Sequence, residues 1–129
     1  MNGNVALDTN AAISILNGEE HVIARTRHQT QVYLPLPVVG ELLFGALNSQ
    51  RAEANLARIQ ELFERSTILD MGAETASQYA QTRLALKRQG RPIPENDVWI
   101  AALCIQHHLS LITDDRHFEW VEGLSLDLV

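Results

Sequence analysis

The chain has 129 residues, of which 46% are hydrophobic and 20% charged, and its formal net charge is −6 at pH 7. These values are typical of one folded domain over residues 1–129 and exclude long disordered segments. Its single cysteine excludes a disulfide framework, and no apolar run approaches the ~20 residues of a membrane-spanning helix, so we expect a cytoplasmic protein without membrane contact.

Short apolar runs alternate with stretches of helical periodicity along the whole chain. The predicted elements, in chain order, are a strand at residues 4–7, a helix at 9–17, a strand at 31–36, helices at 38–47 and 52–65, a strand at 67–69, helices at 73–89 and 97–108, a strand at 110–113, a short helical turn at 114–118 and a last edge strand at 124–128. Strands that alternate with helices indicate an α/β fold, in which a mainly parallel, twisted sheet of four or five short strands has helices on both faces.

Four acidic residues stand close to the places where predicted strands end or helices begin. Asp8 directly follows the first strand, Glu41 lies early in the helix after the second strand, Asp97 opens a helix, and Asp115 follows the strand at residues 110–113. In doubly wound sheets the ligand crevice lies outside the carboxyl ends of the strands, near the reversal of strand order. We therefore expect these carboxylates to meet in one pocket.

Such a pocket has to be neutralised, because two unit charges ~4 Å apart repel by about 4 kcal/mol at an effective dielectric of ~20. An oxygen-only site near neutral pH favours a Mg²⁺ or Mn²⁺ ion, and a cation with open positions binds phosphate. Each acid also has an ordinary interpretation. Asp8 and Asp97 could cap helices, Asp115 could be a turn residue, and Glu41 could form a buried ion pair with an arginine.

Four segments together resemble the PIN domain, and within it the VapC-type toxins of bacterial toxin–antitoxin pairs. The segments are Leu7-Asp8-Thr9-Asn10, Val38-Val39-Gly40-Glu41-Leu42-Leu43-Phe44-Gly45-Ala46, Pro92-Ile93-Pro94 through Asp97-Val98-Trp99-Ile100-Ala101-Ala102, and Leu111-Ile112-Thr113-Asp114-Asp115-Arg116-His117-Phe118. The resemblance covers essentially the whole chain and implies a metal-dependent endoribonuclease that forms a homodimer and is inhibited by a small antitoxin. No acid of the family pattern is missing, and the family spacing selects Asp115 over Asp114.

The resemblance also suggests roles for these residues. Asp8 and Asp97 would be metal ligands, and Glu41 and Asp115 would hold the ion through water or coordinate a second ion. In-line attack by water on an RNA phosphodiester would then leave a 5′-phosphate and a 3′-hydroxyl. Neighbouring polar side chains would orient a carboxylate or a water molecule. These are Thr9, Asn10 and Thr113.

The negative net charge argues against a broad electrostatic grip on nucleic acid, although acids that hold a metal do not repel phosphate. Five cations are candidates for contact with the RNA backbone: Arg83, Lys87, Arg88, Arg91 and Arg116. The cations before Gly90 could instead only complement the C-terminus of a helix.

The five histidines show no zinc-ligand spacing, so we expect them to be solvated surface residues. They are His21, His28, His107, His108 and His117. The alternative to an enzyme is a catalytically silent PIN-like module that binds another protein. Cleavage of RNA that depends on Mg²⁺ or Mn²⁺ would distinguish the two.

Overall fold

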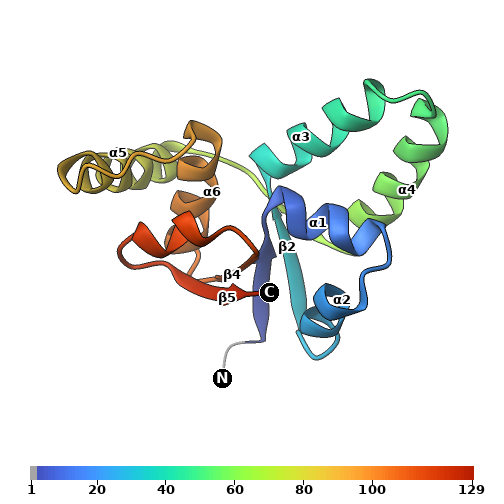
Figure 1. Cartoon of the computed structure of the whole chain (residues 1–129), viewed down its shortest axis with the longest axis horizontal. Coiled ribbons are helices and arrows are strands. Elements are labelled where there is room, and N and C mark those ends of the chain that lie inside the picture. The colour runs from blue at the N-terminus through green and yellow to red at the C-terminus, as the bar shows by residue number, and fades with distance from the viewer. Residues whose placement is uncertain (1–2) are drawn as a thin grey trace.

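A computed structural model describes residues 3–129 of the chain. Its elements are β1 (Asn4–Leu7), α1 (Thr9–Leu16), α2 (Glu20–Thr26), β2 (Gln31–Pro35), α3 (Leu36–Leu47), α4 (Ala52–Glu64), β3 (Thr67–Leu69), α5 (Ala73–Arg88), α6 (Glu95–Gln106), β4 (Ser110–Thr113), the 3₁₀ helix η1 (Arg116–Trp120) and β5 (Ser125–Leu128). Figure 1 shows their arrangement around the central sheet.

The sheet has five strands in the order β3-β2-β1-β4-β5, and every neighbouring pair is parallel. The predicted α/β class and parallel sheet are therefore confirmed. The chain steps from β1 to β2 in one direction and later returns to place β4 on the other side of β1. Strand order thus reverses between β1 and β4, and ligands bind at such a position in doubly wound folds.

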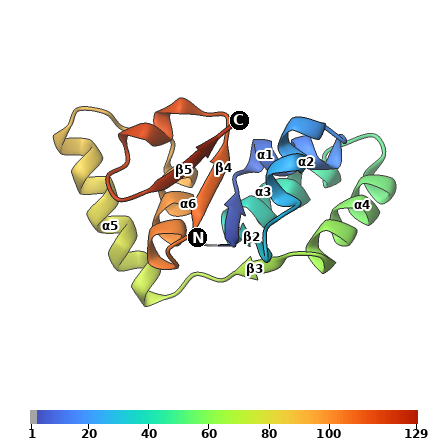
Figure 2. The ribbon, with the colours of Figure 1, turned by 90° about the horizontal axis from the view of Figure 1, so that it is seen from below.

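Helices α1 to α4 lie on one side of β1, and α5 and α6 lie on the other, in both views of the ribbon (Figures 1 and 2). Right-handed crossovers give this result, because connections that run in opposite directions along a sheet cover opposite faces. The core between these layers is apolar. Its most deeply buried side chains include Leu7, Leu34, Ile100, Leu111 and Ile112. Within residues 3–129, no helix combines the length and the apolar character that crossing a bilayer requires.

Two differences from the predicted elements have clear causes. Helix α2 was not predicted, because Val22 is its only buried residue and one buried position gives no periodic signal. Helix α6 begins at Glu95 with Pro94 as its N-cap, two residues earlier than predicted. Asp97 consequently lies within the first helical turn, and the interpretation of Asp97 as a helix cap is wrong.

Candidate active site

Asp8 is fixed at the carboxyl end of β1 by two hydrogen bonds. The side chain is the N-cap of α1, where its Oδ1 accepts from the backbone N–H of Ala11 at 2.8 Å. The hydroxyl of Thr113 donates to its Oδ2 at 2.5 Å. Only 5% of Asp8 is exposed. Burial raises the pKa of Asp8 to about 6 despite these hydrogen bonds, and the negative charges of Asp114 and Asp97 act in the same direction.

Thr113 connects the acids of two neighbouring strands. It is fully buried at the end of β4, which pairs with β1. Its hydroxyl donates to Asp8 and also accepts from the backbone N–H of Asp115 at 3.0 Å. One hydroxyl therefore sets the relative positions of Asp8 and of the loop that carries Asp115, at the reversal of strand order.

His117 lies between two carboxylates from different elements. Its Nε2 is 2.9 Å from Oδ2 of Asp97 on α6, and its Nδ1 is 2.9 Å from Oδ1 of Asp115. Asp115 also caps η1 by accepting from the backbone N–H of His117 at 3.2 Å. One ligand atom from each of the three residues falls within 4.8 Å of the others.

Burial raises the pKa of Asp97 above its ordinary value, although the contact with His117 opposes the rise. The negative charges of Asp115 and Glu41 raise it further. Asp97, with 22% of its side chain exposed, is thus electrostatically coupled to the acids on the two neighbouring elements. Without a bound cation these carboxylates repel one another, and a cation among them would offset that repulsion.

Glu41 lies on the exposed surface of α3, which contacts α6. Its Oε1 accepts a hydrogen bond of 2.6 Å from the hydroxyl of Thr9, the first residue of α1. The sequence-based alternative of a buried ion pair with an arginine is therefore wrong, because Glu41 is exposed and bonded to a threonine. The negative charge of Glu41 nevertheless helps to raise the pKa of Asp97.

The structure thus brings Asp8, Glu41, Asp97 and Asp115 into one neighbourhood at the β1/β4 reversal. Of the three polar residues expected beside the acids, Thr9 and Thr113 bond to them. The third, Asn10, is exposed on the first turn of α1.

His117 is the residue that sequence reasoning missed. We expected a solvated surface side chain, yet only 21% of it is exposed and it contacts two of the four acids. The available signal was its position two residues after Asp115 in a predicted helical turn. That spacing allows the backbone N–H and the ring of His117 both to contact the Asp115 carboxylate.

The candidate RNA-binding cations lie mostly on or just after α5. Lys87 and Arg88 occupy its last turn, where cations complement the helix dipole, and this position is compatible with both interpretations. The Arg91 guanidinium lies 5.3 Å from the centroid of the Trp120 ring. Arg83 contacts Tyr79 and lies beside a carboxylate of α6. The fifth cation, Arg116, is exposed and is 3.7 Å from Glu119.

The donor set fits a hard divalent cation. It is dominated by carboxylate oxygens, which such cations prefer, and His117 is the one imidazole in the cluster, where it lies between two of the carboxylates. Asp8 contributes a charge that is costly in its buried position without a positive partner. Residues 3–129 therefore contain an acidic cluster able to bind a metal ion.

Comparisons with known proteins place this geometry in a family. The PIN domain model matches residues 5–124. The chain is 37% identical over 121 residues to a Shigella flexneri protein named tRNA(fMet)-specific endonuclease VapC, covering 92% of both chains. It is 32% identical over 123 residues to ribonuclease VapC1 of Haemophilus influenzae, also covering 92% of both.

Solved structures agree with the sequence comparison. DNA-bound VapBC from Salmonella typhimurium superposes with a TM-score of 0.89 at 29% identity, covering 98% of each chain. VapBC-1 from nontypeable Haemophilus influenzae gives a TM-score of 0.89 at 28% identity, covering 97% of each. The chain belongs to the PIN domain family.

Proposed function

We propose that this protein is an endoribonuclease that hydrolyses RNA phosphodiester bonds with a bound Mg²⁺ or Mn²⁺ ion and serves as the toxin of a VapBC-type pair. The observation that carries the proposal is the buried, hydrogen-bonded Asp8 at the β1/β4 reversal, electrostatically coupled to Asp97. The relatives named tRNA(fMet)-specific endonuclease VapC and ribonuclease VapC1, each matched over 92% of its length, supply the substrate class. An RNA substrate would also place the protein in the cytoplasm.

The chain's own residues would divide the work by position. When bound, a divalent ion polarises the phosphoryl oxygen and lowers the pKa of water. Asp8, Asp97 and Asp115 would hold that ion, and Thr113 would keep the Asp8 carboxylate in the orientation that α1 and β4 give it. Glu41, oriented by Thr9, would accept a hydrogen bond from the water that attacks the phosphorus atom.

The silent binding module is the weaker alternative. Keeping Asp8 ionised in a buried site costs stability, and a module with no chemistry to perform gains nothing from that cost. All four acids are present in one neighbourhood. An inactive relative would have no physical reason to keep them there.

A protein partner is supported by the surface of α3. Three of its large apolar side chains project from the fold: Leu43 is 36% exposed, Phe44 68% and Leu47 65%. Exposed apolar groups gathered on one helix are typical of an interaction site. Structures named VapBC are among the structural relatives, and we propose that a VapB-like antitoxin binds this chain at α3. We also propose that two copies of the chain form a homodimer, as the family resemblance implies.

Cleavage of a labelled RNA by the purified protein tests the enzymatic proposal. Mg²⁺ or Mn²⁺ should support cleavage, and a chelator should abolish it. Asp97→Asn should reduce kcat by at least about 100-fold, the size of a typical electrostatic or acid–base contribution. Asp70→Asn is the matched control, because Asp70 is exposed after β3 and outside the acidic cluster. The proposal would be contradicted if the wild type cut no RNA with Mg²⁺ and none with Mn²⁺, or if Asp97→Asn were as active as Asp70→Asn.

A further inference from the structure

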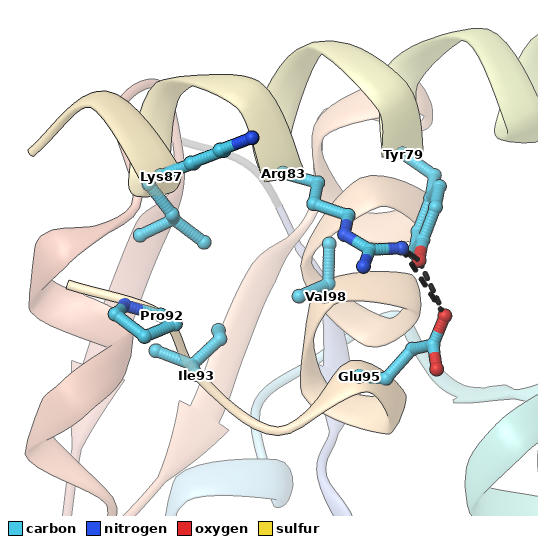
Figure 3. Close-up of a pocket in the computed structure, with 8 residues that line it drawn as sticks. Tyr79, Arg83, Lys87, Pro92, Ile93, Glu95 and Val98 are labelled. Atoms are coloured by element: carbon cyan, nitrogen blue, oxygen red, sulfur yellow. Dashed lines mark hydrogen bonds and ion pairs between the residues drawn. The ribbon is translucent and has the colours of Figure 1, made fainter. Parts of the chain in front are cut away.

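A cavity of about 550 Å³ lies between α5 and the start of α6, the helix that carries Asp97 (Figure 3). Its inner surface is apolar, formed by Leu86, Ile93 and Val98. Arg83 and Lys87 of α5 also line the cavity; in Figure 3 the Arg83 side chain extends toward Tyr79 and Glu95, and the Lys87 side chain runs along the helix. This volume falls within the range of ordinary small-molecule sites. The combination of an apolar floor and a cationic rim suits a ligand with a flat apolar part and an anionic part.

The charge of this region is opposite to that of the chain. Residues 75–94 contain no Asp or Glu, although the net charge of the whole chain is −6. The same twenty residues carry four of the ten basic residues: Arg83, Lys87, Arg88 and Arg91. The cavity itself is lined by two cations, Arg83 and Lys87, and by one acid, Glu95, so its small excess of positive charge favours an anionic ligand.

The two cations on the rim are available to such a ligand. Lys87 is exposed and has no hydrogen-bond acceptor or ion-pair partner among residues 3–129. Arg83 donates to the hydroxyl of Tyr79 at 2.8 Å, and its nearest carboxylate oxygen, on Glu95, is 3.6 Å away. Both side chains of that long ion pair are more than half exposed. Such pairs contribute little, so an incoming phosphate could replace Glu95 as the partner of Arg83 at low cost.

Tyr79 holds the rim in place. Its ring stacks on Trp99 with 3.8 Å between centroids, and its hydroxyl donates to Glu95 at 2.5 Å. The Arg83 guanidinium is therefore anchored by a rigid aromatic pair, so less entropy is lost when a ligand binds.

The cavity and the acidic cluster flank the same helical turn. Glu95 and Asp97 both lie in the first turn of α6, and residues two apart on a helix point to different sides. A polynucleotide that crosses this turn can present one phosphate to the acids and the next nucleotide to the cavity. A short acidic peptide would match the cations but would leave the apolar floor unfilled.

We infer that this cavity is a nucleotide-binding subsite for single-stranded RNA. The base and ribose of a nucleotide that neighbours the cleaved bond would pack on Leu86, Ile93 and Val98, and its phosphate would bind Arg83 and Lys87. The inference rests on the proposed ribonuclease function for its choice of ligand, but binding can be measured without cleavage.

Fluorescence anisotropy with a short fluorescein-labelled single-stranded RNA, in the presence of a chelator, measures that binding. Lys87→Gln and Arg83→Gln should each weaken binding roughly tenfold, as expected for one charge-assisted hydrogen bond. Each should also lower the slope of log K against log salt by about 0.7, the contribution of one phosphate contact on a single strand. Ile93→Ser should weaken binding without changing the slope.

Arg51→Gln is the matched control, because Arg51 is exposed beside α4, at the opposite end of the molecule from α5 (Figure 1). It should leave affinity and slope unchanged. In cleavage assays, Lys87→Gln should raise KM and leave kcat within about twofold, since the cavity holds the substrate away from the reacting phosphate.

The outcomes separate this inference from the proposed function. If the wild type cuts no RNA but the rim variants still lose affinity and salt slope, the subsite stands and the enzymatic proposal falls. If the wild type cuts RNA and the rim variants keep wild-type affinity, slope and KM, the subsite is overturned. The subsite would also be overturned if the Arg83 and Lys87 variants changed the oligomeric state on gel filtration while keeping wild-type RNA affinity. The cavity would then belong to an interface between copies of the chain.

Discussion

Asp8→Asn should stabilise the metal-free protein at neutral pH while abolishing its activity. The asparagine keeps the shape of the side chain and an oxygen that accepts from the backbone N–H of Ala11, so α1 retains its cap. The substitution removes a negative charge that is buried and repelled by other acids. Function and stability are therefore expected to change in opposite directions at this one position.

The pKa of Asp8 gives the magnitude. A rise from 3.8 to about 6 corresponds to a cost of about 3 kcal/mol for keeping the carboxylate ionised in the folded protein, at about 1.4 kcal/mol per pH unit. The asparagine gives back part of this gain, because its neutral oxygen makes a weaker hydrogen bond to Ala11 than a carboxylate does. Its amide nitrogen would also face Thr113, and since that nitrogen can only donate, the Thr113 hydroxyl would lose its present acceptor. We expect a net stabilisation of about 1–2 kcal/mol at neutral pH.

The pH dependence has a definite sign. Between pH 3.8 and about 6 the folded protein keeps the Asp8 proton that the unfolded chain has lost. The contribution of Asp8 to stability therefore falls as pH rises through this window and is constant above it. The Asp8→Asn protein lacks that fall, so its advantage over wild type should be smallest near pH 4 and largest near pH 7.

Urea denaturation of both proteins in a chelator, from about pH 4 to about pH 7, measures this difference. Asp70→Asn controls for the general loss of one negative charge, because Asp70 is exposed and remote from the cluster. A stability difference between wild type and Asp8→Asn that does not vary with pH, or an Asp8→Asn protein less stable than wild type at pH 7, would refute the reasoning.

Three further predictions address the neighbouring residues. Thr113→Val should destabilise the protein by about 1–3 kcal/mol and lower kcat, because it removes a fully buried hydroxyl that donates a hydrogen bond to Asp8. Urea melts measure the first effect and RNA cleavage rates the second. His117→Leu should lower the free energy of unfolding by about 1–2 kcal/mol without metal and by less with Mg²⁺, because the ring lies between two carboxylates whose repulsion a bound cation would relieve. Urea melts with and without Mg²⁺ compare the two losses of stability. Phe44→Ser should change the stability of the free chain by less than about 0.5 kcal/mol, because the side chain is 68% exposed, but weaken antitoxin binding in a titration.

The sequence was sufficient for the fold because each element carried its own local signal. The strands β3 and β4 begin and end where apolar patterning and turn residues predict. Pro37 lies in the first turn of α3, as its fixed φ and missing N–H require. The signal failed at α2, which buries only Val22 and is therefore held by its connections more than by its own amphipathic face.

The site was less predictable, because side-chain partners depend on packing between distant elements. Topology rules gave the edge of the sheet to which Asp8 and Asp115 belong. They could not show that Thr113 bonds to Asp8, since this contact depends on the register of β1 against β4. They also could not orient His117, because its ring position depends on how η1 packs against α6.

The capping and catalytic interpretations of these acids turn out to be compatible. Asp8 caps α1, as its sequence context predicts, and Asp115, predicted only as a turn residue, caps η1, yet both also belong to the acidic cluster. A cap holds a carboxylate oxygen in one place through a backbone N–H, which is the rigidity that a metal ligand or a catalytic base needs. Asp→Ala at either position would therefore remove a helix cap together with a charge, and its effect on activity could reflect a displaced helix. Asp→Asn removes the charge and keeps an acceptor for the cap, so only that substitution measures the contribution of the carboxylate itself.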